Sequence, residues 1–339
     1  MAKITLEARG EEHIFDCNDG DTISRAALRA QLGFPYACNV GSCGNCRFEL
    51  LEGSVTHARE NPPAWSERDL KRNRYLGCQA QPQGDCRIKL RLDPSYLTDT
   101  PPKTLQGTLL EVVELTHDIF EFRYQLSEPH AFLPGQYALI SVPGVPGGRA
   151  YSMCNLTGDG TQWHFQIKKV PNGAATSVLF TQQDLGMTVQ LDGPYGTAYV
   201  RPESPRDILC LAGGSGLSPM ISIARAKAHD PRLQDRKLTF VFGGRTGRDI
   251  CGEDILQELP GYGTLIDFHA AISNPDEDDG SWTGPTGYIH ELARTVLGDA
   301  EIAQREIYFA GPPAMAQAIQ KLLHELQVPP EQVHFDEFY

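Results

Sequence analysis

The sequence contains no apolar stretch of the roughly 18–20 residues that a membrane span needs. Its first residues, Met-Ala-Lys-Ile-Thr-Leu-Glu, include a lysine but no following apolar segment, so no secretory signal is expected. With 30 basic against 43 acidic residues, the chain lacks the positive charge that favours nonspecific binding to nucleic acid. It also lacks an internal repeat. These absences predict a cytoplasmic protein that binds neither membrane nor nucleic acid.

The length and charge distribution indicate several modules. A chain of 339 residues exceeds the size of one typical core, so two or three domains are expected. Residues 1–95 carry equal numbers of basic and acidic side chains, so the whole excess of 13 negative charges falls in residues 96–339. This unevenness fits separate modules, although charges that only maintain solubility would produce it too.

Changes in hydrophobic period along the chain place the domain boundaries. Short β-rich runs and a helix that begins near Ile23 come first. Residues 93–103 are rich in proline and turn formers, which indicates a linker. Short strands separated by turns then predict a small antiparallel barrel, and from residue 207 strands alternate with helices, as in a parallel α/β sheet. The predicted boundaries are 1–95, a linker at 96–103, 104–203 and 204–339.

Four of the nine cysteines lie close together in the first module. Cys38, Cys43, Cys46 and Cys78 have the C-x4-C-x2-C spacing with a distant fourth cysteine that is typical of plant-type [2Fe–2S] sites. Each of two irons needs two thiolates, so a tight loop can supply three sulfurs while a distant segment supplies the fourth. These four cysteines are the predicted metal ligands.

Other interpretations of the cysteines remain open at this stage. Zinc sites usually show a second Cys or His pair, which is absent here. A redox dithiol at Cys43 and Cys46 should follow a strand and begin a helix. Cys86 could replace Cys78 as the fourth ligand.

The residues around these cysteines resemble a known family. The segments Phe34-Pro35-Tyr36-Ala37-Cys38, Gly41-Ser42-Cys43-Gly44-Asn45-Cys46 and Tyr75-Leu76-Gly77-Cys78-Gln79 are similar to the NADH reductase components of bacterial multicomponent aromatic oxygenases, of the toluene monooxygenase type. The resemblance implies an α+β β-grasp ferredoxin domain, fused to an FAD-binding β-barrel and an NAD-binding α/β domain like those of ferredoxin–NADP reductases.

A second motif points to flavin. Arg149-Ala150-Tyr151-Ser152 matches the R-x-Y-S motif of the ferredoxin reductase superfamily, although a buried aromatic residue beside a surface arginine could produce the same pattern. The resemblance implies that Arg149 binds the pyrophosphate, that Tyr151 stacks on the flavin ring, and that Ser152 donates a hydrogen bond to it. Contacts to a diphosphate favour FAD over FMN. Further flavin contacts are expected from Lys169, Val170, Gly173 and Thr176.

Two glycine-containing segments indicate a nicotinamide nucleotide site. The usual G-x-G-x-x-G fingerprint is absent, but Gly213-Gly214-Ser215-Gly216 lies between a predicted strand and a predicted helix, where amides can hold a pyrophosphate. A purely structural turn is the alternative. Ala310-Gly311-Pro312 and Met315 resemble the second nicotinamide motif of the family, with Ala310 where the family usually has cysteine.

The resemblance also implies catalytic residues and an electron donor. Phe338, near the end of the chain, is expected to cover the flavin until nicotinamide displaces it, and Asp336 and Ser152 are expected to be catalytic. Arg245 and Arg248 follow a predicted strand where they could bind the 2′-phosphate of NADPH, but the resemblance implies NADH.

The expected function is electron transfer from NADH through FAD and a [2Fe–2S] cluster to a partner protein. The resemblance implies a Rieske ferredoxin, or a diiron or Rieske oxygenase component, as a transient partner that docks near residues 37–45. A monomer is favoured. The alternatives are a reductase of free flavin or small acceptors and a non-catalytic redox sensor.

Overall fold

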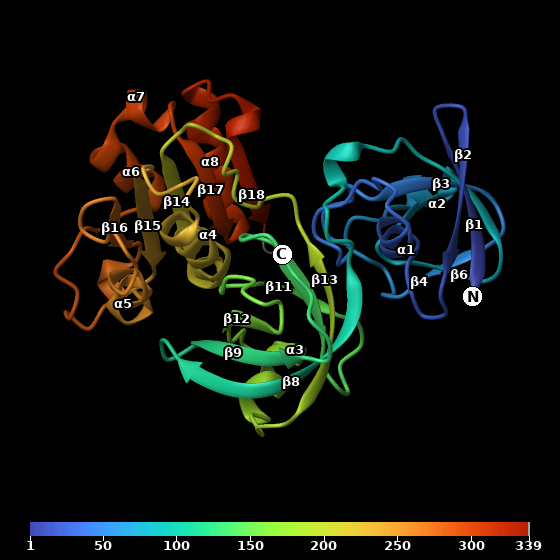
Figure 1. Ribbon diagram of the computed structural model, residues 1–339, viewed down its shortest axis with the longest axis horizontal. Helices are drawn as coiled ribbons and strands as arrows, with labels where there is room; N and C mark the ends of the chain where they lie inside the picture. The colour runs from blue at the N-terminus through green and yellow to red at the C-terminus, as the bar shows by residue number, and fades with distance from the viewer. Residues whose placement is uncertain (338–339) are drawn as a thin grey trace. The chain divides into compact units, whose positions relative to one another are not determined.

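The protein is represented by a computed structural model that describes residues 1–337 (Figure 1). The chain forms two compact units, each of which is described by itself. One unit comprises residues 1–105, 138–150 and 190–197, and the other comprises residues 106–137, 151–189 and the described residues from 198 onward. The predicted domain boundaries at 1–95, 104–203 and 204–339 stay a prediction.

The secondary structure consists of short strands in the first two thirds of the chain and alternating strands and helices in the last third. The strands are β1 (Ala2–Ala8), β2 (Glu11–Cys17), β3 (Arg47–Glu52), β4 (Val55–His57), β5 (Arg74–Leu76), β6 (Ala80–Pro82), β7 (Cys86–Lys89), β8 (Lys103–Glu114), β9 (Ile119–Leu126), β10 (Tyr137–Ser141), β11 (Arg149–Ser152), β12 (Gln162–Lys168), β13 (Thr188–Tyr195), β14 (Ile208–Gly213), β15 (Leu238–Gly244), β16 (Ile266–Ile272), β17 (Glu306–Gly311) and β18 (Val333–Glu337). The α-helices are α1 (Ile23–Arg29), α2 (Glu67–Lys71), α3 (Ala174–Thr181), α4 (Leu217–His229), α5 (Glu253–Gln257), α6 (Ile289–Leu297), α7 (Asp299–Ile302) and α8 (Pro313–Glu325). The 3₁₀ helices are η1 (Pro94–Tyr96), η2 (Gly214–Gly216), η3 (Gly247–Asp249), η4 (Pro275–Glu277) and η5 (Pro330–Gln332).

The N-terminal residues form a mixed five-stranded sheet in the order β2-β1-β7-β3-β5. Strand β1 pairs antiparallel with β2 and parallel with β7. Alternate residues of β1, including Ile4 and Leu6, are fully buried, as expected for a strand that covers a core with one face. Helix α1 buries Ile23, Ala26 and Ala27. This arrangement confirms the expected α+β ferredoxin domain.

A six-stranded sheet in the order β11-β10-β13-β8-β9-β12 follows. A β-bridge between Met153, just after β11, and Phe165 of β12 joins the two edge strands. The sheet therefore curls nearly into a closed barrel, which removes most of its free edges. Its interior is filled by large side chains, among which Trp163, Phe165 and Tyr124 are fully buried. The antiparallel barrel prediction is confirmed in this form.

The last third of the chain forms a parallel sheet in the order β16-β15-β14-β17-β18. All six residues of the central strand β14 are buried, as in sheets that helices cover on both faces. Side chains of α4 pack with one set of alternate β14 residues, and side chains of α6 and α8 pack with the other set. The predicted α/β domain is confirmed.

Within residues 1–337, none of the helices combines the length and the apolar character required to cross a membrane.

Candidate functional site

The four predicted metal ligands lie around one irregular loop. Cys38, Cys43 and Cys46 lie between α1 and β3, and Cys78 follows β5. Cys46 and Cys78 are 2% and 1% exposed, whereas Cys38 and Cys43 are half-buried. The thiols interact in pairs by hydrogen bonding, Cys38 with Cys43 and Cys46 with Cys78. The structure therefore brings together four sulfurs from separate segments, as a [2Fe–2S] cluster requires.

Backbone amides of the loop point toward one of these sulfurs. The amides of Ser42 and Cys43 donate to Sγ of Cys38, with nitrogen-to-sulfur distances of 3.3 and 3.4 Å. The hydrogen bond with the Cys43 thiol, followed by these amides, lowers the pKa of Cys38 to about 5 although burial opposes the shift. The hydrogen bond with Cys46 likewise lowers the pKa of Cys78, while the same two bonds raise the pKa of the donor thiols, Cys43 and Cys46. One thiol of each pair is therefore favoured as a thiolate, the form that binds a metal.

Glycine is required at two turns of the loop. Gly41 and Gly44 both have φ of +82°, a conformation that side chains rarely adopt. A Cβ on Gly44 would lie 2.3 Å from Nη1 of Arg47, which itself donates to the Gly44 carbonyl. The turns leave the amides free to face sulfur.

Cys86 has a different environment. It lies on β7, is buried, and its thiol donates to the carbonyls of Ser54 and Gly84 at 3.4 and 3.3 Å. The Cys86 thiol thus already has hydrogen-bond partners on the protein backbone. They favour Cys78 over Cys86 as the fourth ligand.

The predicted flavin motif forms strand β11. Nη1 of Arg149 donates to the carbonyls of Pro146, Gly147 and Gly148, which orders the preceding turn. Ser152 is 4% exposed, and its buried hydroxyl has no hydrogen-bond partner among residues 1–337. Because buried hydroxyls are rarely unpaired, this orphaned group fits a bound ligand with an acceptor atom. Tyr151 is half-buried.

The segment from Lys169 to Thr176 forms a tight turn that begins α3. The buried Thr176 hydroxyl accepts a hydrogen bond from the Val170 amide at 3.2 Å. A Cβ on Gly173 would lie 2.5 Å from the same hydroxyl, so the turn needs glycine there. Nζ of Lys169 lies 5.9 Å from the Phe180 ring. The Thr176 hydroxyl thus holds the turn in place, and Val170 within the turn is exposed.

The two predicted nicotinamide segments meet at the carboxyl ends of β14 and β17. These strands are parallel neighbours, with Ala212 opposite Ala310. A Cβ on Gly216 would lie 1.9 Å from the Ala310 carbonyl oxygen, and one on Gly213 would lie 2.6 Å from Sδ of Met315. Such close packing requires glycine at both positions. Nucleotides bind at this edge of open parallel sheets, so the arrangement fits a nucleotide site.

Helix α4, which begins directly after the glycine loop, contacts the flavin motif. Ser218, in the first turn of α4, donates from its hydroxyl to the Ser152 carbonyl at 2.6 Å and accepts from the Gln166 amide at 3.2 Å. These bonds fix the start of the nucleotide-binding helix against β11 and β12. Sequence reasoning missed Ser218, although it directly follows the glycine loop.

Asp336 lies beside Ala310, its register partner on the adjacent strand β18. Its Oδ2 is buried with no hydrogen-bond partner within the described residues. Burial raises the pKa of Asp336 to about 7. The structure thus brings two predicted nicotinamide-site residues together. The other predicted catalytic residues are Ser152, described above, and Phe338, which lies outside the described residues.

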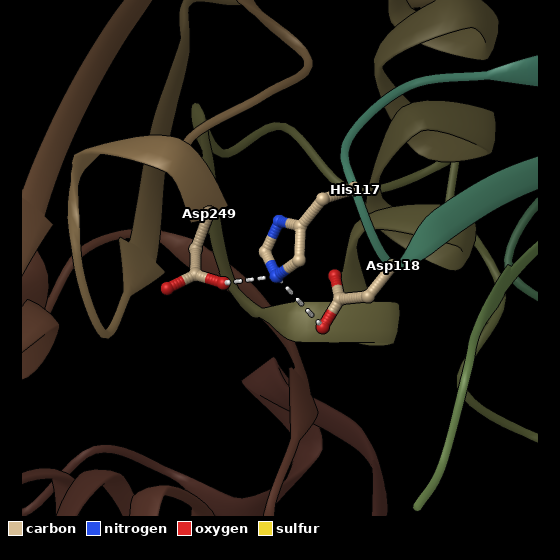
Figure 2. A group of neighbouring side chains, drawn as sticks. All are labelled: His117, Asp118 and Asp249. Atoms are coloured by element: carbon tan, nitrogen blue, oxygen red, sulfur yellow. Dashed lines mark ion pairs between the residues drawn. The ribbon is translucent and has the colours of Figure 1, made fainter.

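A group of charged side chains that the sequence did not indicate lies near the flavin turn. Nε2 of His117 is 3.7 Å from Oδ2 of Asp118 and 3.9 Å from Oδ1 of Asp249 (Figure 2). Nζ of Lys168 lies 2.9 Å from Asp118 and 3.8 Å from Asp249. The ammonium group lies between the two carboxylates and offsets part of their charge, so an ion-pair network describes the group better than a metal site.

Within this network, Asp249 is held by hydrogen bonds and by nearby positive charges. Burial would raise the pKa of Asp249, but hydrogen bonds from the Thr246 amide and hydroxyl, with the charges of Lys168 and His117, outweigh burial and lower it. Its carboxylate caps η3 through these hydrogen bonds.

Three family models match the chain in the order that the fold shows. A 2Fe-2S iron-sulfur cluster binding domain matches residues 6–83, an oxidoreductase FAD-binding domain matches 106–199, and an oxidoreductase NAD-binding domain matches 210–321. The fold and these matches define an iron–sulfur flavoprotein oxidoreductase.

Full-length relatives specify the family. The chain is 38% identical over 328 residues to a ferredoxin–NAD(P)+ reductase of Metapseudomonas resinovorans, covering 95% of this chain and 96% of the relative. It is 34% identical over 331 residues to the ferredoxin–NAD+ reductase component of the alkene monooxygenase system of Xanthobacter autotrophicus, covering 96% and 97%. The solved structure of the ferredoxin reductase in carbazole 1,9a-dioxygenase superposes with a TM-score of 0.90 at 34% identity, covering 99% and 98%. The chain belongs to the ferredoxin–NAD(P)+ reductase family of multicomponent oxygenase systems.

Proposed function

We propose that this protein oxidises NADH and passes the electrons singly to a Rieske ferredoxin or to an oxygenase component of a multicomponent aromatic oxygenase system. One observation carries the proposal: a four-cysteine cluster loop, a flavin strand with an orphaned hydroxyl and a glycine loop at a parallel-sheet edge occur in one polypeptide. Bound FAD accepts two electrons together from a nicotinamide and can release them one at a time.

The cluster loop would bind the iron–sulfur centre through Cys38, Cys43, Cys46 and Cys78. The amides of Ser42 and Cys43, which point at Sγ of Cys38, would stabilise the negative charge that an added electron brings. Such hydrogen bonds raise the reduction potential of a cluster and so favour its acceptance of an electron.

The flavin residues would bind and orient FAD. Arg149 offers charged donors for the diphosphate, and Tyr151 offers a ring for stacking. The hydroxyl of Ser152 would gain in the flavin the acceptor that it lacks among the described residues. The turn that Thr176 holds, from Lys169 to Gly173, would present backbone amides to the phosphates.

The nicotinamide residues would bind the donor at the edge where β14 and β17 end. Gly213, Gly214, Ser215 and Gly216 would hold the pyrophosphate, while Ala310, Gly311, Pro312 and Met315 would shape the nicotinamide pocket. Ala310 leaves more room than the cysteine usual in the family. With a pKa of about 7, the Asp336 carboxyl can hold a proton beside Ala310 at neutral pH.

The acceptor would dock transiently near residues 37–45, where Ala37 and Asn45 are exposed. Redox encounters are usually small and short-lived, so a salt-sensitive complex with a monomeric reductase is expected. We also propose that the protein works in the cytoplasm.

Replacing Cys43 by Ser separates the proposed function from its alternatives. The variant should lose electron transfer to the protein acceptor but keep NADH oxidation by ferricyanide, because that reaction needs only the flavin. Cys86→Ser is the matched control, since its thiol contacts only backbone carbonyls. Unchanged acceptor reduction in Cys43→Ser would favour a flavin or small-acceptor reductase. A native protein that cannot turn over NADH with any acceptor would favour a redox sensor.

A further inference from the structure

Three successive loops meet at the nucleotide-binding edge of the parallel sheet. Strand β15 lies beside β14 with Gly213 opposite Gly243, and β16 lies beside β15 with Ile272 opposite Gly244. Because the strands are parallel, the glycine loop after β14, Arg245 after β15 and the residues after β16 all leave the sheet at the same edge. Neighbouring strands are only about 4.8 Å apart.

The position of Arg245 is one at which dinucleotide-binding folds distinguish their donors. In such folds the adenosine ribose lies near the end of the strand beside the glycine loop, where an acidic residue favours NADH and an arginine accommodates the 2′-phosphate of NADPH. Arg245 and the exposed Arg248 would therefore favour NADPH if they acted alone.

Arg245 does not act alone, because the segment after β16 is attached to its loop. The amides of Ser273 and Asn274 donate to the carbonyls of Gly244 and Arg245 at 3.0 and 2.9 Å. These backbone hydrogen bonds attach the residues just before the acidic segment, which we define as residues 276–279, to the loop that carries Arg245.

Side chains of the acidic segment then engage that loop directly. Nη2 of Arg245 lies 3.2 Å from Oε2 of Glu277, and Oδ1 of Asp278 accepts a hydrogen bond from the Gly247 amide at 2.6 Å. Asp278 also accepts from the amides of Gly280 and Trp282, so its position is fixed on both sides. Glu277 thus lies where it can neutralise the arginine.

The charges at this edge do not balance. The acidic segment carries four carboxylates against the two guanidinium groups of Arg245 and Arg248. Asp249 is not counted here, because it hydrogen-bonds to Thr246 and lies 3.8 Å from Lys168. A phosphate monoester would bring nearly two further negative charges at neutral pH. A 2′-hydroxyl brings none.

We propose that the acidic segment makes this protein selective for NADH, with Glu277 neutralising Arg245 and the neighbouring carboxylates repelling a 2′-phosphate. This inference rests on the proposed function, since it assigns the donor specificity of the same nucleotide site. It gives the acidic segment a role beyond that of a solvated loop. Selectivity by a repulsive element is a common way to reject a competing ligand.

The test compares the binding of 2′,5′-ADP and 5′-AMP to the FAD-loaded full chain by calorimetry. Glu277→Gln should lower the Kd for 2′,5′-ADP about three- to tenfold, since an exposed charge a few ångströms away contributes on the order of 1 kcal/mol, and should leave the Kd for 5′-AMP unchanged. Adding Arg245→Gln to Glu277→Gln should abolish the gain. Glu325→Gln, which breaks another exposed ion pair with Lys321, is the matched control and should change neither Kd.

The inference and the proposed function can fail separately. If the native protein oxidises NADH and reduces an acceptor, but Glu277→Gln leaves the ratio of the two dissociation constants unchanged, the specificity role of the acidic segment is wrong and the proposed function stands. A gain for 2′,5′-ADP that persists in the Arg245→Gln, Glu277→Gln double variant would also overturn the role given to Arg245. If neither nucleotide binds and the native protein does not oxidise NADH, both proposals fall.

Discussion

At the scale of single residues, two buried polar atoms without a partner among residues 1–337 lie on predicted site residues. They are Oγ of Ser152 and Oδ2 of Asp336. A buried polar group without a hydrogen-bond partner destabilises a folded protein, and such a group fits a site where a bound ligand supplies the partner. Both atoms therefore lead to predictions about the loaded protein.

Removing the Ser152 hydroxyl should slow flavin reduction by NADH. A hydrogen bond to a buried partner is worth about 1–3 kcal/mol, so Ser152→Ala should reduce the rate by about five- to a hundredfold. Stopped-flow absorbance of the FAD-loaded protein measures this rate. Ser177→Ala, at an exposed position of α3, should keep the native rate. A native rate in Ser152→Ala would exclude the role given to this hydroxyl.

Asp336 should make stability depend on pH. Its folded pKa of about 7 exceeds the ordinary value of 3.8, so the unfolded state loses its proton more readily. This carboxyl therefore destabilises the fold increasingly as the pH rises from about 4 to 7, by up to about 4 kcal/mol above pH 7.

Asp336→Asn removes that penalty. Its melting temperature should equal the native one near pH 4 and exceed it at pH 8. Thermal unfolding followed by circular dichroism across this pH range measures the difference. A difference that does not change with pH would show that the carboxyl is not buried in the way described.

Single residues also show which parts of the site could be predicted from the sequence alone. The cysteine spacing indicated a cluster because a short loop with such spacing can place three sulfurs together. Ser218 and the pair of Arg245 with Glu277 could not be found in that way. Each depends on contacts between segments more than thirty residues apart, which only the folded sheet brings together.

At the scale of elements, helix α1 is held by a partly buried arginine. Arg29, the last residue of α1, forms ion pairs with Asp21 and with Asp192 of β13, the latter at 2.7 Å. Asp192 is 7% exposed and also accepts from the Tyr195 hydroxyl at 3.0 Å. Burial would lower the pKa of Arg29, but the surrounding acidic groups outweigh it and raise it. The contact joins α1 to the end of β13.

Breaking this pair should destabilise the protein. Arg29→Met leaves the carboxylate of Asp192 buried without its cation, which costs about 2–5 kcal/mol for such pairs. Chemical denaturation should show this loss, and adding Asp192→Asn should restore part of it. An Arg29→Met variant as stable as the native protein would contradict the account.

The predictions of secondary structure were most accurate for elements long enough to show a hydrophobic period. The alternation of strands and helices predicted from residue 207 onward is observed, and its helices α4, α6 and α8 are 13, 9 and 13 residues long. Helix α2 has only five residues, too few to show a period, and was missed although the capping box of Ser66 and Asp69 marks its start. The short strand β18 was missed for the same reason.

At the scale of the whole molecule, an excess of 13 negative charges lies in residues 96–339, whereas residues 1–95 are neutral. Although the cluster loop lies in the neutral part of the chain, an approaching acceptor meets the field of the whole protein, so its encounter with the loop should respond to ionic strength. Stopped-flow reduction of the partner should slow severalfold between low salt and about 0.5 M, where the Debye length falls below about 5 Å. A rate that stays constant across this range would contradict a charge-steered encounter.

The order of the three modules was predictable because each has its own pattern: a cysteine loop, short strands with turns, and alternating strands and helices. The matches to three family models confirm that order. The residues of the nucleotide site alone did not indicate the donor, because Arg245 and Arg248 favour NADPH and only the resemblance implies NADH.

The central claim is that a two-electron donor site and a one-electron iron–sulfur centre act together through one flavin. An anaerobic titration of the reconstituted protein with NADH, followed by absorbance and electron paramagnetic resonance, tests it most directly. We predict that flavin absorbance falls while the signal of a reduced [2Fe–2S] cluster rises. Protein that holds zinc or no iron at its four cysteines, or flavin bleaching without a cluster signal, would contradict the account.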